Sequence, residues 1–571
     1  MKKRSICNTW FLNTGVLLIA ILLILKLGYV QITKGEFYKS RAESKYLVSS
    51  DGTFDRGTIF FEEITGRKIS AATVIPDYTL AVDPTKIVDK EALADKLLGF
   101  VKFDRADFIA RAGRQHDQYE EVAKHLSENE VAGIRGLGEK SVILEKNKKR
   151  FYPGGRVAAQ VLGFVGSDGS DSALPTGRYG LERYYNETLA RSGGDDSSSF
   201  FADLFLKPGA AILFDRGREG DLVTTIEPTV QGLLERILED DVLKKYSAAS
   251  AGGIIMNPKT GEIYAMATMP SFDPSNFSKE KDQRVFANPL VDGVYEMGSI
   301  IKPLTMAAGI DAGVVTASTT YDDKGFRVIN TKRISNYDGK ARGVVSMQEV
   351  LNKSLNTGTI FVMERLGKDR FREYFKAYGL GEETGIDLPN EGVGDLQNLE
   401  SPRDIEYATA SFGQGISMTP IEVVRALSVL ANGGVLVTPH VVKSTEYSIG
   451  PSRDFVPNGE RRVIKKETSE EISRMLTIVV DKALLEGTLK MEHYSIAAKT
   501  GTAQLVEDGG YSKTDYLHTF FGYFPSRDPK FLVFLAVKNP RGEAYASHTL
   551  SAPFMQITKF LLNYYEVPPD R

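Results

Sequence analysis

The chain has 571 residues, 42% of them apolar, a formal net charge of −3 and a single cysteine. At about 100–200 residues per domain, this length predicts more than one folded unit, and the apolar content excludes wholesale disorder. The balance of basic and acidic residues argues against nucleic-acid binding, which usually needs a basic excess. The lone Cys7 excludes an internal disulfide and a cysteine-based zinc site, and the six histidines form no HExxH motif. We therefore expect no metal and no other cofactor.

The N-terminus contains a segment that is apolar enough to cross a membrane. Residues 10–30 are mostly apolar, with an unbroken apolar run from Val16 to Leu25. A helix of this length measures about 31 Å and matches the roughly 30 Å hydrocarbon core of a bilayer. No small-x-small cleavage site follows the apolar run, so we favour an uncleaved anchor over a signal peptide. Basic residues on both sides of the span leave its orientation open.

The remaining chain changes character near residue 222. Residues 31–222 predict mixed strands and short helices, with an exposed polar loop at 192–199. Beyond this point we expect a strand at 222–226, a helix from 228 to about 243, a hairpin at 252–267, helical stretches at 346–367, 420–431 and 468–485, and strands at 518–524 and 531–537. Strands at both ends with helices between them predict a sheet covered by helices.

The first of three polar clusters is Ser299-Ile300-Ile301-Lys302-Pro303. Proline is tolerated only in the first turn of a helix, so Pro303 predicts a helix start near Ser299. Residues i and i+3 share one helix face, which brings the Lys302 amine beside the Ser299 hydroxyl. A serine hydroxyl becomes a good nucleophile when a base takes its proton. Lys302 can serve as that base if burial lowers its pKa.

The second cluster, Ser354-Leu355-Asn356, places a hydroxyl and a carboxamide two residues apart on a turn or short loop. Such a pair can relay a proton to a departing amine and hold a substrate amide.

The third cluster is Lys499-Thr500-Gly501-Thr502, on a predicted strand with small neighbours. A substrate chain can lie against such a strand edge. The lysine and the two threonine hydroxyls suit a carboxylate.

Each motif has a second copy: SxxK at 278–281, SxN at 127–129 and KTG at 259–261. Each motif alone is therefore weak, and surface polarity is the competing interpretation. The order Ser299, Ser354, Lys499, with glycine and proline placed around the first serine, is far more specific.

The ordered set SxxK, SxN, KTG resembles the penicilloyl-serine transferases, which comprise penicillin-binding proteins and serine β-lactamases. The segments GQG-x-x-x-TP at 413–420, KTGTAQ at 499–504, RGTI at 56–59 and YGLE at 179–182 resemble class B penicillin-binding proteins. A class A protein would carry an EDxxFxxHxG glycosyltransferase signature, a β-lactamase would be about half this length, and a Ser-His-Asp hydrolase would need a GxSxG elbow. The sequence has none of these features.

The resemblance implies a fold class with a single N-terminal transmembrane helix, a mixed α+β pedestal of the dimerisation type, and an α/β penicilloyl-serine-transferase domain with an antiparallel sheet covered by helices. The expected bounds are a cytoplasmic tail at 1–9, the transmembrane helix at 10–30, the pedestal at 31–222, the transpeptidase domain at 223–565 and a tail at 566–571. The expected location is the cytoplasmic membrane, single-pass, with the catalytic domain outside the cytoplasm.

The resemblance also implies a peptidoglycan D,D-transpeptidase that works through an acyl-serine. Ser299 is then the nucleophile and Lys302 the base, with the backbone N–H groups of Ser299 and Thr502 as the oxyanion hole. Ser354 passes a proton to the leaving D-Ala, Asn356 binds the donor amide, and Lys499, Thr500, Gly501 and Thr502 bind substrate.

The implied partners are peptidoglycan stem peptides, lipid-linked precursor strands, β-lactams, a membrane glycan polymerase and division or elongation proteins. No nucleic acid is implied. Two alternatives stay open, a D,D-carboxypeptidase and a penicillin-sensing or scaffolding protein that does not cross-link.

Overall fold

The computed structural model describes residues 54–114, 116–167, 175–191, 219–448, 450–457, 459–507 and 510–571. The segment at 10–30 that we predict to span the membrane and the polar loop at 192–199 lie outside these residues. In the described part of the chain, no helix is both long and apolar enough to cross a membrane. The described part of the chain divides into two compact units, a smaller one built on Asp77–Lys148 and a larger one that contains the described residues of Arg56–Pro76, Lys149–Ala190 and Phe214–Arg571.

The smaller unit packs three short helices against strands. Its elements are the second half of β2 (Lys68–Val82), α3 (Lys90–Leu98), α4 (Arg105–Arg111), β3 (Glu120–Ala123), α5 (Glu128–Gly136) and most of β4 (Val142–Phe151). Asp89, Asp104 and Ser127 cap the three helices with side-chain oxygens that accept backbone N–H groups, as helix N-termini require. The apolar faces meet in a core around Leu80, Leu97 and other buried side chains.

The larger unit includes part of the region that we predict to be the pedestal. The elements here are β1 (Ile59–Glu62), the first half of β2, α6 (Ala159–Leu162), β5 (Val165–Gly166), β6 (Thr176–Gly177), α7 (Gly180–Tyr184) and α8 (Asn186–Leu189). Arg56 and Glu182, which come from the RGTI and YGLE segments, form a buried ion pair, and Arg150 binds the other oxygen of Glu182. Breaking such a buried pair from one side costs about 3–5 kcal/mol. The RGTI and YGLE segments are therefore in direct contact through this ion pair.

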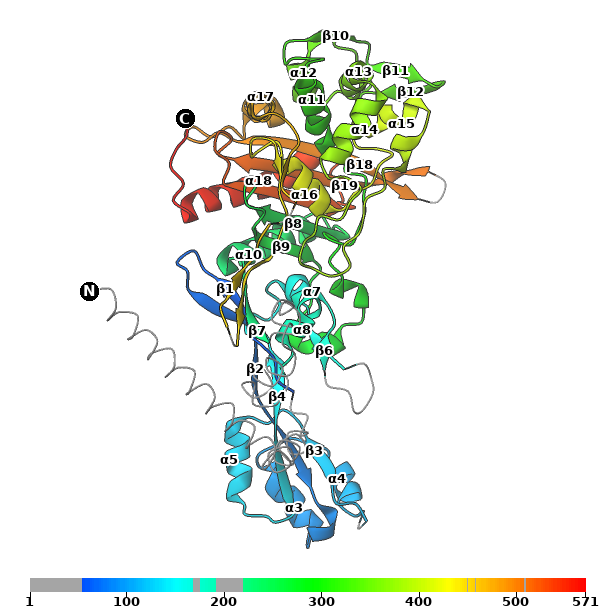
Figure 1. Ribbon diagram of the computed structural model, residues 1–571. Helices are drawn as coiled ribbons and strands as arrows, with labels where there is room; N and C mark the ends of the chain where they lie inside the picture. The colour runs from blue at the N-terminus through cyan, green and yellow to red at the C-terminus, as the bar shows by residue number, and fades with distance from the viewer. Residues whose placement is uncertain are drawn as a thin grey trace, which may run out of the picture. The chain divides into compact units, whose positions relative to one another are not determined.

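A five-stranded antiparallel sheet forms the centre of the larger unit (Figure 1). Its strand order is β18-β19-β20-β8-β9, with β8 (Ser250–Met256), β9 (Ile263–Met269), β18 (Ala497–Glu507), β19 (Gly510–Phe524) and β20 (Phe531–Lys538). Strands from both ends of the region thus lie side by side, which confirms the predicted sheet. β7 (Gly220–Thr224) pairs with β1 and with β15 (Val442–Tyr447) outside this sheet.

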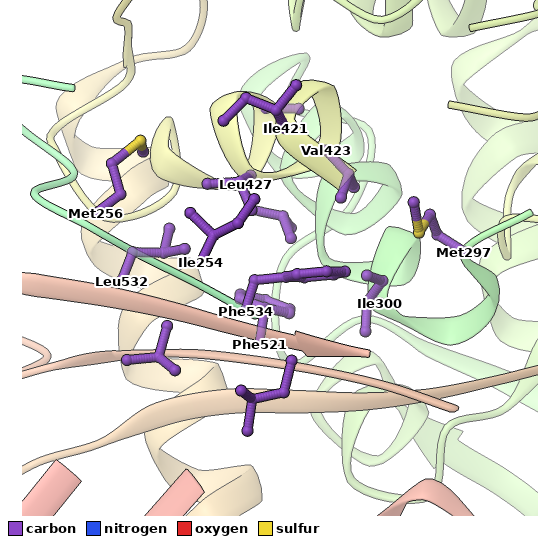
Figure 2. Close-up of a cluster of buried hydrophobic side chains, with 14 of the residues drawn as sticks. Ile254, Met256, Met297, Ile300, Ile421, Val423, Leu427, Phe521, Leu532 and Phe534 are labelled. Atoms are coloured by element: carbon purple, nitrogen blue, oxygen red, sulfur yellow. The ribbon is translucent and has the colours of Figure 1, made fainter. Parts of the chain in front are cut away.

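Helices cover both faces of the sheet. On one face lie α10 (Pro228–Arg236) with its π-helical continuation Ile237–Lys244, and α18 (Ala546–Tyr564), where Phe520 stacks on Phe554. The next residue along β19, Phe521, points to the opposite face, as strand alternation requires. Figure 2 shows Phe521 and Phe534 there, near Val423 and Leu427 of α16 (Pro420–Ser428). Removing one such phenylalanine costs about 3–5 kcal/mol, so this packing fixes the sheet beneath the site.

The remaining elements are inserted between β9 and β18. They are α11 (Lys302–Asp311), β10 (Thr320–Asp323), β11 (Phe326–Ile329), β12 (Lys332–Ser335), β13 (Gly343–Ser346), α12 (Met347–Asn352), α13 (Asn356–Leu366), α14 (Lys368–Ala377), α15 (Asp404–Ala410), α16, β14 (Val435–Leu436), β15, β16 (Arg453–Asp454), β17 (Arg461–Arg462) and α17 (Lys466–Ile478). The helical stretch predicted at 346–367 is divided into α12 and α13, and the turn predicted around Ser354 lies at the break between them.

Candidate active site

Ser299 lies in one turn of 3₁₀ helix that leads into α11. The turn spans Gly298–Ile301, and the first turn of α11 contains Pro303. In a 3₁₀ turn, residues i and i+3 lie one above the other, so Ser299 and Lys302 share one side of the helix. The predicted helix start near Ser299 is confirmed, although the α-helix itself begins at Lys302.

Two glycines allow the segment around Ser299 to pack directly on β18. A Cβ on Gly501 would lie 2.4 Å from Thr519 Oγ1 and 2.8 Å from the carbonyl oxygen of Met297. Thr519 Oγ1 donates a hydrogen bond to that same carbonyl at 3.1 Å. Gly298 has a φ of +63°, and a Cβ there would meet the Thr502 carbonyl oxygen at 3.2 Å. The first and third motifs are therefore in contact.

The second motif lies at the break between α12 and α13. Ser354 has a φ of +52°, in the left-handed region that costs a non-glycine residue about 1–2 kcal/mol. The Lys302 amine donates to the carbonyl oxygen of Ser354 at 2.6 Å and to its Oγ at 3.1 Å. The lysine of the first motif thus binds the serine of the second and supports its strained backbone.

Lys302 is buried, and none of the described residues provides it with an anionic partner. Its side chain is 0% exposed, and no carboxylate among the described residues pairs with its amine, whose hydrogen bonds go to the uncharged oxygens of Ser354. Burial, followed by the positive charge of Lys499, holds the pKa of Lys302 well below its ordinary value. An uncharged amine keeps a lone pair, which is what a general base requires.

Asn356 begins α13 and faces the hairpin formed by β11 and β12. Its Nδ2 donates to the carbonyl oxygen of Ser335, the last residue of β12, at 2.9 Å. This bond orients the carboxamide beside the cleft described below.

A buried hydrogen-bond network holds this region in place. Thr357 Oγ1 donates to Asp323 at 2.8 Å, and Asn336 Nδ2 donates to the same carboxylate at 3.0 Å. Asn336 also accepts the backbone N–H of Thr357 at 3.2 Å. Thr357 follows Asn356 and Asn336 follows Ser335. The network therefore fixes both partners of the hydrogen bond between Asn356 and Ser335. Sequence reasoning missed these three residues, since polar residues in separate segments carry no local signal of burial.

The third motif lies on β18, the edge strand of the described sheet. Lys499 is 4% exposed, and burial lowers its pKa to about 8. Its amine donates to the carbonyl oxygen of Thr500 at 2.9 Å. Thr502 Oγ1 accepts the backbone N–H of Ala546, at the start of α18, at 3.2 Å. An edge strand has backbone groups that can pair with an extended peptide.

One cleft of about 1000 Å³ joins the three motifs. Six of the predicted site residues line it: Ser299, Ser354, Asn356, Lys499, Thr500 and Thr502. Lys302 lies beneath the cleft surface on Ser354, and Gly501 lies buried against Met297. Other walls come from the β11–β12 hairpin, from residues 479–485 after α17, and from residues 544–547 around the start of α18. The structure therefore brings together every residue that the sequence analysis selected.

Glu296 connects the nucleophile segment to two other parts of the cleft region. Its Oε1 accepts the backbone N–H of Gly415 at 2.9 Å and the hydroxyl of Tyr511 at 3.1 Å. Its Oε2 is buried without a hydrogen-bond partner among the described residues, and burial raises the pKa of Glu296. Gly415 belongs to the GQG segment, whose Gly413 accepts the backbone N–H of Gly298 at 3.0 Å. The sequence analysis did not select Glu296, although its place three residues before Ser299 is a usable signal.

The second copies of the three motifs lie away from the cleft. Lys259 lies in the turn between β8 and β9 and pairs with Asp528. Ser127 caps α5, and Ser278 lies in a short 3₁₀ helix, Pro274–Lys279. None of the three lines the cleft in the described structure. The spatial arrangement thus separates the functional set from its copies.

Two family models match the chain. Residues 251–559 match the penicillin binding protein transpeptidase domain, and residues 64–199 match the penicillin-binding protein dimerisation domain. The chain is similar to stage V sporulation protein D of Bacillus subtilis, with 31% identity over 554 residues that cover 95% of this chain and 83% of the relative. It is also similar to the penicillin-binding protein PbpB of Mycolicibacterium smegmatis, with 30% identity over 75% of this chain and 67% of the relative.

Solved structures show the same fold. Penicillin binding protein 2X of Streptococcus thermophilus matches with a TM-score of 0.73 and 20% identity, over 90% of this chain and 80% of that one. Penicillin binding protein 3 of Mycobacterium tuberculosis, complexed with aztreonam, matches with a TM-score of 0.67 and 22% identity, over 91% of this chain and 98% of that one. The fold thus combines a dimerisation domain with a transpeptidase domain. The chain belongs to the penicillin-binding transpeptidase family, in its class B form.

Proposed function

We propose that this protein is a peptidoglycan D,D-transpeptidase that cross-links stem peptides through an acyl-serine intermediate. The observation that carries the proposal is the shared cleft, in which Ser299 and Lys499 face the same space while the buried Lys302 amine binds Ser354. A relative in Buchnera aphidicola, 24% identical over 100% of this chain and 97% of its own length, carries the name peptidoglycan D,D-transpeptidase FtsI.

Acylation begins when Ser299 Oγ attacks the carbonyl carbon of the penultimate D-Ala. The lone pair of Lys302 takes the hydroxyl proton as the new C–O bond forms. The backbone N–H groups of Ser299 and Thr502 hold the oxyanion; losing one such donor typically costs about 3–4 kcal/mol of barrier. When the C–N bond breaks, the proton passes through Ser354 to the nitrogen of the departing D-Ala, which leaves as a neutral amine.

Deacylation reverses these roles. The amine of a second stem peptide attacks the ester carbonyl, its proton returns through Ser354 and Lys302, and Ser299 regains its hydroxyl hydrogen. Water in place of the amine gives a carboxypeptidase product.

The other motif residues position the donor. Lys499, cationic below its pKa of about 8, binds the terminal carboxylate together with Thr500 and Thr502. Gly501 keeps β18 close to the nucleophile segment. Asn356 binds the donor amide, and the donor backbone lies along the edge of β18. β-Lactams, which mimic the D-Ala-D-Ala end, acylate Ser299 in the same cleft.

The placement of the protein in the cell is part of the proposal. Residues 10–30 form a single membrane anchor after a cytoplasmic tail at 1–9, and the catalytic domain at 223–565 lies outside the cytoplasm on a pedestal at 31–222. The apolar sequence of the anchor and the dimerisation-domain match support this arrangement. We propose a membrane glycan polymerase as partner and lipid-linked precursor strands as acceptors.

Labelling with a fluorescent penicillin tests the nucleophile. The wild-type protein should be labelled and Ser299→Ala should not, while Ser278→Ala, in the second SxxK copy, should be labelled like the wild type. Labelling of Ser299→Ala would refute the assignment. A product assay with stem peptides then distinguishes cross-linked dimers, which we expect, from hydrolysed peptide alone, which would indicate a carboxypeptidase.

A further inference from the structure

Cations line the cleft beyond the catalytic motifs, and no carboxylate among the described residues of its lining balances them. The described lining residues include Arg333, Lys353 and Lys499 but no aspartate or glutamate. The proposed mechanism assigns Lys499 to the terminal carboxylate of the donor. Arg333 and Lys353 have no role in that mechanism.

Arg333 is held in place and keeps its hydrogen-bond donors available. It lies on β12, where its guanidinium carbon is 3.7 Å from the ring centre of Phe326 on β11. Stacking of this kind holds the guanidinium plane but leaves the N–H edge open. Neighbouring arginines have carboxylate partners, Arg327 with Glu364 and Arg342 with Asp338. Arg333 has none among the described residues; its Nε makes one long contact, 3.5 Å, to Ser335 Oγ.

Lys353 is the second unassigned cation. It is exposed and directly precedes Ser354, at the end of α12. Glu349, one helical turn earlier, is near enough in sequence for an ion pair, but its carboxylate accepts from Asn352 at 2.7 Å. In the described structure Lys353 thus adds an uncompensated charge to the cleft wall beside the second motif.

Both cations lie near the Asn356 side of the cleft. Arg333 and Ser335 are two residues apart, so they occupy the same face of β12, and the Ser335 carbonyl holds Asn356. Asn356 binds the donor amide on the N-terminal side of the scissile bond in the proposed mechanism, whereas Lys499 binds the C-terminal carboxylate. Arg333 and Lys353 therefore flank the part of the donor that precedes the D-Ala-D-Ala pair.

We propose that Arg333 and Lys353 select acyl donors that carry a second carboxylate on the N-terminal side of the scissile bond. This inference rests on the proposed function and defines its donor as a dianionic peptide. A guanidinium and a carboxylate form a charge-assisted, bidentate pair, so a neutral carboxamide at the same place binds less well.

The test compares donor peptides that end in D-Ala-D-Ala and differ in one group. In each comparison, one peptide carries a carboxylate on a residue before D-Ala-D-Ala, and the second peptide carries a carboxamide at the same place. Two such comparisons are made, with the variable group one residue or two residues ahead of D-Ala-D-Ala. The acylation rate of the full chain is measured by competition with fluorescent penicillin. We expect the wild type to prefer the carboxylate in at least one comparison by about five- to tenfold, because two partly exposed charge pairs can each contribute about threefold.

Variants locate the source of the preference. Arg333→Gln and Lys353→Gln should each reduce it by about threefold or more without slowing acylation by the carboxamide peptide. Lys332→Gln is the matched control, because it removes one positive charge from the opposite face of the same strand, outside the cleft lining. It should keep the wild-type preference.

Three results would overturn the inference: no preference in the wild type, an equal loss in the control, or an effect on amine transfer but not on acylation. The last result would place the carboxylate on the acceptor instead. Penicillin labelling of Ser299 reports on the proposed function separately, since it should persist in all three variants whichever way the donor comparison falls.

Discussion

Replacing Ser354 separates the backbone geometry of the second motif from its chemistry. The φ of +52° costs a residue with a Cβ about 1–2 kcal/mol. Ser354→Ala removes the hydroxyl and keeps this strain, whereas Ser354→Gly removes both. Glycine has more freedom to lose on folding, at a cost of about 0.5–1 kcal/mol relative to alanine. The difference leaves Ser354→Gly more stable than Ser354→Ala by about 0.5–1 kcal/mol.

The chemistry of the two variants should be the same. A positioned proton-transfer group contributes about 10²–10⁴-fold to a rate, so both variants should lose transfer activity by a similar factor in this range. Lys302 keeps its 2.6 Å bond to the carbonyl oxygen of residue 354 in both, so its position should be retained.

Thermal denaturation and a single-turnover transfer assay measure these two effects. A difference of this size corresponds to a Tm higher by about 0.5–1 °C for Ser354→Gly than for Ser354→Ala, because the unfolding entropy of so large a unit is high. Wild-type transfer by Ser354→Gly would refute the role of the hydroxyl. A lower Tm for Ser354→Gly than for Ser354→Ala would refute the strain argument.

Three further predictions concern other contacts of the site. Gly501→Ala should cost about 1–3 kcal/mol of stability and slow penicillin acylation about a hundredfold, because the new Cβ pushes the nucleophile segment off β18. Gly232→Ala is the control, since no described atom lies within 4 Å of a Cβ at that position. Burial raises the pKa of Glu296, so the native state holds its proton more tightly than the unfolded state does. The free energy of unfolding of the wild type should therefore fall as pH rises from the pKa of Glu296 in the unfolded state to its pKa in the native state. Urea denaturation at several pH values should show that Glu296→Gln loses this pH dependence, and an unchanged profile would contradict it. Burial lowers the pKa of Lys499 to about 8, so KM for a donor that ends in a carboxylate should rise above about pH 8, whereas KM for a donor that ends in a carboxamide should stay flat. An equal rise in KM for both donors would show that deprotonation of Lys499 is not the cause.

The sheet and the first motif follow from local rules. Pro303 fixes where the helix around Ser299 can begin. The apolar runs 254–256, 263–266 and 531–537 mark strands, and the polar residues 257–262 between the first two mark the turn of the hairpin. The small residues around Lys499 predict room for a substrate chain along the strand, whereas the close approach of Gly501 to Met297 was not predicted. These expectations need only sterics and periodicity.

Other parts of the site depend on contacts between distant segments. The sequence predicts a turn at Ser354, but its left-handed backbone and the bond from Lys302 to its carbonyl depend on another segment. The burial of Asp323 and the stacking of Arg333 on Phe326 arise only when the chain folds around them. No local sequence pattern predicts this burial or this stacking, since aspartate and arginine most often lie on protein surfaces.

The proposed chemistry depends on an uncharged Lys302, whose protonation can be followed by titrating the lysine ε-carbons with heteronuclear NMR. Comparison of the full chain with Lys302→Met would assign the signal. We predict that this amine loses its proton far below about 10.4, the pKa of a free lysine side chain. If the Lys302 amine stayed charged up to that ordinary pKa, it could not act as the general base.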